Sequence, residues 1–316
     1  MSRPEFGSLP ELAGRRWQAI DPLLPAITGW TTGCGANLTV HGPDGSLVAA
    51  GSCVHWTAAG GSLDLIEAPP RRFVLMPYLT GSDVLNALDT LLSRWRDHLA
   101  AVPEAAAADT TAMIRWPSRD VTGVRALLAH GLAPFGVTAA RPVRRAPAVV
   151  AYCSPSVRIR RATPADLDVV LAMTMEVLRF DAYFGVLEPP GAEQELRAQL
   201  AAELEEDPWT WLAERDGDPV GMLTAERPES AAYIAPRTSG SPAACLLALY
   251  VAPAERGTGV GAALTGQLHR SAEAAGVGVI LLEYEQVNPL SVPFWGRQGY
   301  RPLWTAWEAR PARRLS

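Results

Sequence analysis

The chain has 316 residues, of which 48% are hydrophobic and 19% charged, so its length allows two domains and its composition is that of a globular protein. No apolar run approaches the ~20 residues of a membrane span, and residues 1–17 lack the apolar core of a signal peptide. The net charge is −5, every basic residue is arginine, and the acidic excess lies in the second half. Without a basic face a nucleic-acid partner is excluded, and we expect a cytoplasmic protein that binds no membrane.

The cysteines and histidines indicate neither a disulfide framework nor a metal site. Cys34, Cys53, Cys153 and Cys245 are scattered and share no CxxC spacing, which favours reduced, mostly buried thiols. The five histidines form no cluster with the spacing of metal ligands. We therefore expect no metal.

The first half contains a predicted hairpin at residues 41–51, where Asp-Gly separates two strands. An apolar strand follows at 72–79, and then a helix at 82–99 with Ser82 as its N-cap and leucines on its inner face. The connection between that strand and that helix has one glycine and no arginine. This connection differs from its counterpart in the second half.

Two segments of the chain resemble each other. Residues 114–134 align with 282–302 without a gap, each running from an apolar strand into a short helix. In both, a cap residue starts the helix and a glycine closes it: Asp120 and Gly131 in the first copy, Asn288 and Gly299 in the second. A second Asp-Gly hairpin at 214–221 repeats the one at 41–51. A duplication accounts for these matches better than coincidence does, with a boundary near 146–157 and domains at 1–150 and 151–316.

The second half has a clear order of elements. Thr163-Pro164-Ala165-Asp166 is a strong helix start, and Gly276 is expected to end a later helix. The expected elements are a strand at 157–162, helices at 163–180 and 191–207, a hairpin at 208–226, a strand at 243–251, a helix at 259–275, a strand at 277–285, a helix at 289–298 and a strand at 301–309.

The connection at 250–264 reads YVAPAERGTGVGAAL, in which three glycines alternate with small residues just before a helix. Glycine in this pattern allows a backbone to come close to a ligand. A P-loop is excluded because GxxxxGK[ST] needs a lysine. A dinucleotide fingerprint would place its third glycine at Leu264, and residues 252–256 separate the strand from the first glycine, where that fold turns tightly.

The segment from Arg256 to Gly261 has the form [Q/R]xxGx[G/A] and resembles the acyl-coenzyme A loop of the GCN5-related N-acetyltransferases (GNAT). Downstream, residues 288–300 follow that family's NxxAxxFYxxxGF pattern, with Phe294–Trp295 at the aromatic pair and Gly299–Tyr300 at its end. The resemblance covers about residues 157–310. It implies an α/β (α+β) fold of two tandem domains, each a mixed, mostly antiparallel, splayed sheet flanked by helices. The N-terminal copy is degenerate and lacks the coenzyme loop.

The resemblance implies acetyl-CoA as the acyl donor. The helix start offers free N–H groups and a favourable dipole to a pyrophosphate, and an arginine adds a charge-assisted contact. By resemblance, the strand before the loop offers its backbone to the pantetheine arm, and the asparagine bonds to the end of that arm. The coenzyme-binding residues we expect are Leu249, Tyr250, Val251, Arg256, Gly257, Thr258, Gly259, Val260, Gly261, Ala262, Asn288 and Trp295.

Acyl transfer to an amine needs a base, a polarised carbonyl and a stabilised thiolate. Backbone N–H near 249–251 can polarise the carbonyl, and Glu283 and Glu285 are candidate bases because they share one face of their strand. The family often uses the tyrosine of its aromatic pair as acid, but Trp295 stands here and an indole cannot deliver a proton at neutral pH. Tyr250, Tyr284 or solvent remain as proton sources.

The function we expect is an acetyl-CoA-dependent N-acyltransferase that moves an acetyl group to a primary amine of a small molecule or peptide. The alternative is a non-catalytic acyl-CoA sensor, which the missing tyrosine and the degenerate copy favour. Segments 179–190 and 227–242 flank the acceptor side in the resemblance, and Asp181, Tyr183 and Phe184 could hold an amine with an apolar body. Whether the chain forms a homodimer is left open.

Overall fold

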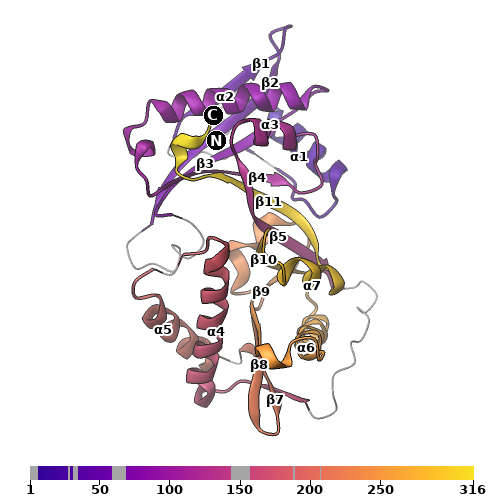
Figure 1. Ribbon diagram of the computed structural model, residues 1–316. Helices are drawn as coiled ribbons and strands as arrows, with labels where there is room; N and C mark the ends of the chain where they lie inside the picture. Colours follow the sequence, from indigo (N-terminus) through magenta and orange to yellow (C-terminus); the bar gives the residue numbers. More distant parts are fainter. Residues whose placement is uncertain are drawn as a thin grey trace. The chain divides into compact units, whose positions relative to one another are not determined.

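The computed structural model (Figure 1) describes residues 6–27, 29–30, 35–58, 69–143, 157–187, 189–206 and 208–316. These residues form two compact units. The first takes in the described chain up to Thr138 together with Pro302–Ser316, and the second takes in Ala139–Arg301. Most of the linker predicted at 146–157 lies outside the described residues, as do Cys34 and Cys153. Cys53 and Cys245 are buried free thiols.

The first unit is a mixed sheet with helices. Its strand order is β1-β2-β3-β4-β11, in which β3 and β4 are parallel and the other pairs antiparallel. The C-terminal strand of the chain therefore pairs with β4 of this unit. Its elements are α1 (Leu9–Ile20), β1 (Asn37–His41), β2 (Leu47–Thr57), β3 (Arg71–Leu79), α2 (Val84–Ala100), β4 (Thr110–Pro117), α3 (Val124–Ala129) and β11 (Arg301–Ala309), and β5 (Ala133–Pro142) contains the boundary between the units.

Helix α2 begins two residues later than the sequence predicts. The predicted cap Ser82 is wrong: Asp83 is the N-cap, and its carboxylate accepts a hydrogen bond of 3.1 Å from the N–H of Asn86. An ionised carboxylate satisfies an end N–H at least as well as a hydroxyl does and suits the helix dipole. The predicted inner face is confirmed, with Leu88, Leu92 and Trp95 fully buried.

The second unit has the same kind of sheet, so the predicted α/β class with mixed sheets flanked by helices is confirmed. Its strand order is β10-β9-β8-β7-β6, in which β9 and β10 are parallel and the other pairs antiparallel. Its elements are β6 (Val157–Arg161), α4 (Leu167–Asp181), α5 (Ala192–Glu205), β7 (Trp209–Arg215), β8 (Asp218–Glu226), β9 (Ala243–Val251), α6 (Val260–Ala274), β10 (Val279–Glu285) and α7 (Ser291–Arg297).

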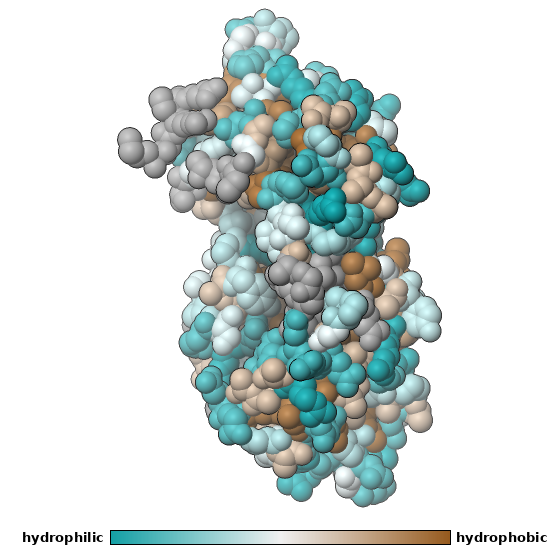
Figure 2. Space-filling view, turned by 90° about the vertical axis from the view of Figure 1, so that its left-hand side faces the viewer, coloured by the Kyte–Doolittle hydropathy of each residue, from teal (hydrophilic) through white to brown (hydrophobic). Residues whose placement is uncertain are grey.

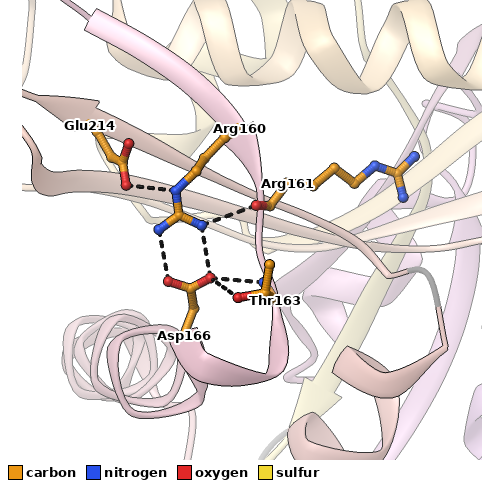
Figure 3. Close-up of polar contacts among 5 residues, drawn as sticks. All are labelled: Arg160, Arg161, Thr163, Asp166 and Glu214. Carbon is orange, nitrogen blue, oxygen red and sulfur yellow. Dashed lines mark hydrogen bonds and ion pairs between the residues drawn. The ribbon is translucent and has the colours of Figure 1, made fainter.

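The start of α4 is fixed by the capping box that the sequence predicts. Thr163 and Asp166 bond reciprocally, and Arg160 on β6 donates two hydrogen bonds of 2.8 Å to the Asp166 carboxylate and one of 2.7 Å to Glu214 (Figure 3). The Arg160 bonds hold the pKa of Asp166 well below its usual value, against the opposing effect of burial. Helix α4 is therefore tied to the edge of the sheet.

The two faces of the second sheet are covered by different helices. Helices α4 and α5 pack on Leu212 and Met222 of the sheet. Helix α6 buries Val260, Leu264 and Leu268 against β7, β8 and β9. Strand β9, which contacts both α4 and α6, thus lies between two helical layers.

The internal repeat is visible in the element order. β4, α3 and β5 follow one another as β10, α7 and β11 do. Gly131 and Gly299 close the two short helices with φ of 74° and 85°, which only glycine adopts at no cost.

The surface mixes residue types. Figure 2 shows hydrophilic and hydrophobic residues interspersed over the face drawn there. In the part of the chain that the structure describes, no helix is both long enough and apolar enough to cross a bilayer.

Candidate functional site

Strands β9 and β10 pair over only part of their length. Their parallel ladder runs from Ala243–Val279 to Leu246–Leu282, although β9 continues to Val251 and β10 to Glu285. At the same point β9 carries a bulge, because Ala225 opposes Leu246, Thr224 opposes Ala248, and Leu247 has no opposite residue in β8. A bulge bends its strand and leaves the extra residue unpaired. The strands therefore separate from Leu247 onward.

The separation leaves polar backbone groups of β9 available. The N–H of Ala252 donates to the carbonyl of Val220 on β8, at 2.9 Å. Peptide groups alternate in direction along a strand, so those of Leu249 and Val251 point away from β8, toward the gap. Tyr250 directs its own peptide group to β8 and contributes its side chain instead.

The glycine loop that follows β9 is shaped by two residues with positive φ. Gly257 and Gly259 have φ of 80° and 94°, and no heavy atom lies within 4 Å of where a Cβ on Gly257 would stand. Backbone N–H groups without a hydrogen-bond partner among the described residues belong to Gly257, Gly259, Val260, Gly261 and Ala262. Thr258 is the exception, since its N–H contacts the carbonyl of Glu255 at 3.4 Å.

Arg256 stands at the mouth of this loop. Its Nε donates to the carbonyl of Val251 at 3.2 Å, and its guanidinium lies 5.7 Å from the ring centre of Phe180 on α4. The side chain is exposed and carries no ion pair among the described residues. A free cation beside a cluster of unpaired N–H groups is an anion-binding arrangement.

A cavity of about 680 Å³ joins these features. It is lined by residues of α4, β9, β10, α7 and the glycine loop, all in the second unit. Of the residues predicted to bind coenzyme or to act as base, those that line it are Leu249, Tyr250, Val251, Arg256, Gly257, Gly259, Gly261, Ala262, Glu283, Glu285, Asn288 and Trp295. Thr258 and Val260 do not line it, and the Val260 side chain is 1% exposed, in the core.

The aromatic pair of α7 packs on the loop helix. A Cβ on Gly261 would stand 3.3 Å from the Phe294 ring, so only glycine allows α6 and α7 to approach this closely. Trp295 is 6% exposed and contacts Phe294 and Tyr300 edge to face, with ring centres 4.8 and 5.4 Å apart. Trp295 thus has packing contacts on one side and the cavity on the other.

Asn288 joins α7 to α4. Its Oδ1 accepts hydrogen bonds of 3.0 and 3.1 Å from the N–H groups of Leu290 and Ser291, which caps α7, and its Nδ2 donates to Asp181 at 3.0 Å. Asn288 is 2% exposed. Burial raises the pKa of Asp181 to about 6, and the Asn288 bond opposes that shift.

The remaining titratable groups of the cavity differ in their partners. Glu283 forms an ion pair with Arg237, and the Glu255 carboxylate accepts hydrogen bonds from Nε and Nη2 of Arg215, at 2.9 and 2.8 Å. Glu285 is half-buried. Tyr284 is 8% exposed, its hydroxyl makes no hydrogen bond within the described residues, and burial raises its pKa.

The structure adds lining residues that the sequence did not single out. Phe180, Glu255 and Leu247 line the cavity, and no sequence signal marks a bulge. Of the expected acceptor segments, 179–190 contributes Phe180 and Asp181, whereas Tyr183 is 84% exposed and 227–242 supplies no lining residue. Among the described residues no group of three or more His, Cys, Asp or Glu could hold a metal ion.

Comparison with known proteins gives one family and a fold. Residues 173–300 match the family model described as the acetyltransferase (GNAT) family. A GCN5-related N-acetyltransferase of Sphaerobacter thermophilus is similar in structure, with a TM-score of 0.54 and 15% identity over 87% of this chain and 81% of that one. A GNAT-family acetyltransferase of Colwellia psychrerythraea has a TM-score of 0.50 and 14% identity over 95% and 96%.

A third solved structure is a tandem GNAT protein from the clavulanic acid biosynthesis pathway. It has a TM-score of 0.45 and 15% identity, over 95% of each chain. No curated protein matches the sequence. At these identities the first two structures show that the fold extends over most of the chain.

Proposed function

We propose that this protein transfers an acetyl group from acetyl-CoA to a primary amine of a small molecule or peptide, a proposal that the match of residues 173–300 to the GNAT acetyltransferase family model supports. The observation that carries the proposal is the cavity between the separated strands, which joins backbone of β9 that points away from β8 to the N–H groups of Gly257, Gly259, Gly261 and Ala262, none of which has a partner among the described residues. A pyrophosphate and a pantetheine arm need those two kinds of group side by side.

The donor half of the cavity suits acetyl-CoA. The N–H groups of Gly257, Gly259 and Gly261 would bind the pyrophosphate, with Arg256 closing over it. The peptide groups of Leu249 and the N–H of Val251 would pair with the pantetheine amides as a strand does with its neighbour, since the carbonyl of Val251 already accepts from Arg256. Asn288 and Trp295 would contact the end of that arm. Val260 and Thr258 support the loop from behind, Val260 by packing and Thr258 by its bonds to Glu255.

When bound, acetyl-CoA supplies an acetyl thioester whose carbonyl needs a hydrogen-bond donor. Leu247 and Leu249 lie where β9 leaves β10, so their N–H groups are our candidates for that donor. Glu285 and Glu283 remain candidate bases, although Glu283 would first have to leave Arg237. Tyr284 is our candidate acid, because its raised pKa keeps the hydroxyl protonated and no partner occupies it.

The second candidate function is an acyl-CoA sensor without turnover. Trp295, where the family often has a tyrosine acid, favours it. The two functions differ in one readout, the release of free thiol when acetyl-CoA and an amine are supplied together. We expect thiol release with a subset of a primary-amine panel; tight coenzyme binding with no thiol from any amine would favour the sensor.

Two variants link turnover to the loop. Arg256→Glu places a negative charge at the phosphate site and Gly259→Asp adds both a charge and a side chain at positive φ, so we expect each to abolish coenzyme binding and thiol release. Gly217→Asp is the matched control, because Gly217 has φ of 93° in the β7–β8 turn, outside the cavity. Equal loss in the control would mean that strain, rather than phosphate binding, explains the Gly259 result.

A further inference from the structure

Asp181 has no arginine partner among the described residues, unlike three other carboxylates that line the cavity. Glu176, Glu255 and Glu283 each contact an arginine: Arg179, Arg215 and Arg237. The side chain of Asp181 has one hydrogen bond, from the neutral amide of Asn288, and no ion pair among the described residues. A half-buried carboxylate without a cation is costly to keep.

The charged groups and tyrosines that line the cavity with Asp181 come from every element that forms it. The charged ones are Glu176 on α4, Glu255 and Arg256 on the loop, Glu283 and Glu285 on β10, and Arg297 on α7. The tyrosines are Tyr250 and Tyr284. Arg256 lies against Phe180, the residue before Asp181, yet forms no ion pair with Asp181. Within the described part of the chain, the Asp181 carboxylate therefore has no cationic partner.

We propose that Asp181 receives the ammonium group of the acceptor, so that the substrate class is a primary amine that binds as a cation with an apolar body. This inference rests on the proposed function and names the acceptor side of the same site. Asn288 donates to Oδ1 of Asp181, and no hydrogen bond to Oδ2 is found among the described residues, so that oxygen is the one we assign to the ammonium. Val177, Phe180 and Leu247 are apolar residues that line the same cavity.

An ammonium group bound to Asp181 can transfer a proton to that carboxylate. Asp181 takes one proton from the ammonium, which frees the nitrogen lone pair to form the C–N bond as the thioester C–S bond breaks and sulfur keeps its electron pair. Once the C–N bond has formed, the nitrogen carries one proton more than the amide product, and that proton passes to the thiolate through Tyr284 or water, so that coenzyme A leaves as the thiol and Tyr284 ends protonated as it began. Asp181 returns its proton to water when the amide leaves, because a carboxyl group of that environment is largely ionised at neutral pH.

Measurements of amine binding and of coenzyme A binding distinguish a failure of this inference from a failure of the proposed function. The probes are 2-phenylethylamine and its neutral isostere 2-phenylethanol, titrated by calorimetry into wild type, Asp181→Asn and Asp168→Asn, each with and without saturating coenzyme A. Asp168 is the matched control, since it lies on the same helix, is 82% exposed, pairs with Arg197 at 2.8 Å and is outside the cavity. Circular dichroism checks that each variant is folded.

We expect wild type and Asp168→Asn to bind the amine about tenfold to a hundredfold more tightly than the alcohol at pH 8, as a charge-assisted contact allows. Asp181→Asn should lose that preference while keeping its affinity for coenzyme A, and wild type should lose it at pH 4.5. Equal amine and alcohol binding by wild type, or a preference retained in Asp181→Asn, overturns the inference. Failure of wild type to bind coenzyme A, with the amine preference intact, instead removes the proposed function alone.

Discussion

At the scale of single residues, the site depends on side chains that the fold holds in an unfavourable state. Asp181 is a half-buried carboxylate with no cationic partner among the described residues, and the Tyr284 hydroxyl is buried with no hydrogen-bond partner among them. Such groups lower the free energy of unfolding, and proteins retain them at sites where a bound ligand supplies the missing ion pair or hydrogen bond. Both are therefore testable through stability as well as through activity.

Asp181→Asn should stabilise the protein at high pH. The folded state holds the Asp181 proton up to about pH 6, whereas the unfolded chain releases it near 3.8, so the stability of wild type falls as pH rises between these values and the cost is constant above them. We expect the free energy of unfolding of the variant, relative to that of wild type, to increase by about 2 kcal/mol as pH rises from 4 to 7. Urea unfolding across that pH range measures this difference in free energy of unfolding, and a difference that does not change with pH contradicts the prediction.

Tyr284→Phe tests the proton donor. We expect turnover to fall about a hundredfold with coenzyme affinity unchanged, because only the hydroxyl is removed from a residue that keeps its ring. Tyr183→Phe is the control, since that side chain is 84% exposed and outside the cavity. Thiol-release kinetics measure both. Unchanged turnover in Tyr284→Phe assigns the proton to solvent.

At the scale of elements, two helix starts determine the site geometry. Asn288 caps α7 and holds Asp181, and Asp166 caps the start of α4, the helix that carries Asp181. The two caps can be tested separately, because one lies in the cavity and the other outside it.

Asn288→Asp and Asn288→Ala should differ in a defined way. Aspartate is as good a cap as asparagine, whereas alanine costs about 1 kcal/mol, so only Asn288→Ala should lower stability through α7. Asn288→Asp places a second carboxylate against Asp181 and should raise the pKa of the pair. The acidic limb of the pH–rate profile should move upward in this variant. A limb that stays in place would show that the limb does not belong to Asp181.

Asp166→Ala should lower the free energy of unfolding by about 1–3 kcal/mol, because it removes the capping box and the carboxylate to which Arg160 donates two hydrogen bonds. The lowered pKa of Asp166 means that its contribution is present above pH 4 and is lost as pH falls below it. Asp168→Ala, on the exposed side of the same helix, should change stability by less than about 0.5 kcal/mol. Thermal unfolding at pH 7 and pH 3 compares them, and an equal cost at both pH values contradicts the role of the ionised pair.

The features that sequence patterns predicted correctly are those whose signals are local. The Thr163–Asp166 box, the Asp216-Gly217 turn and the glycines of the loop depend on neighbours within four residues. The bulge at Leu247 and the contact between Asn288 and Asp181 depend on distant strands and helices, so local patterns cannot predict them. Ser82 and Asp83 are both good cap residues, so the local pattern does not tell which of them caps α2.

At the scale of the whole molecule, the duplication explains why one copy has the cavity. We propose that residues 1–150 carry the copy without a coenzyme loop and residues 151–316 the binding copy. Trp116 aligns with Tyr284, is 1% exposed and donates from Nε1 to the carbonyl of Asp120 at 2.9 Å. A Cβ on Gly123 would stand 2.5 Å from the Trp116 ring. A buried indole thus fills the place that a cavity-lining tyrosine has in the other copy.

The first unit depends on the end of the chain. β11 pairs with β4 from Ala112–Ala309 to Pro117–Trp304, and Trp307 and Leu315 belong to the core of this unit. Trp307→Ala should therefore destabilise that unit by about 3–5 kcal/mol, while coenzyme affinity stays near wild type below the transition. Hydrogen exchange in β3 and β4 reports the effect, and Val121→Ala, at a residue 78% exposed, is the control. Faster exchange confined to β7 and β8 contradicts it.

The central claim is that the loop from Arg256 to Ala262 and the free backbone of β9 bind acyl-CoA. Calorimetric titration of wild type and Gly259→Asp with acetyl-CoA tests it most directly, because binding needs no knowledge of the acceptor. We predict saturable heat with wild type at micromolar to sub-millimolar acetyl-CoA and none with Gly259→Asp. Absence of heat with wild type at millimolar acetyl-CoA would contradict the claim.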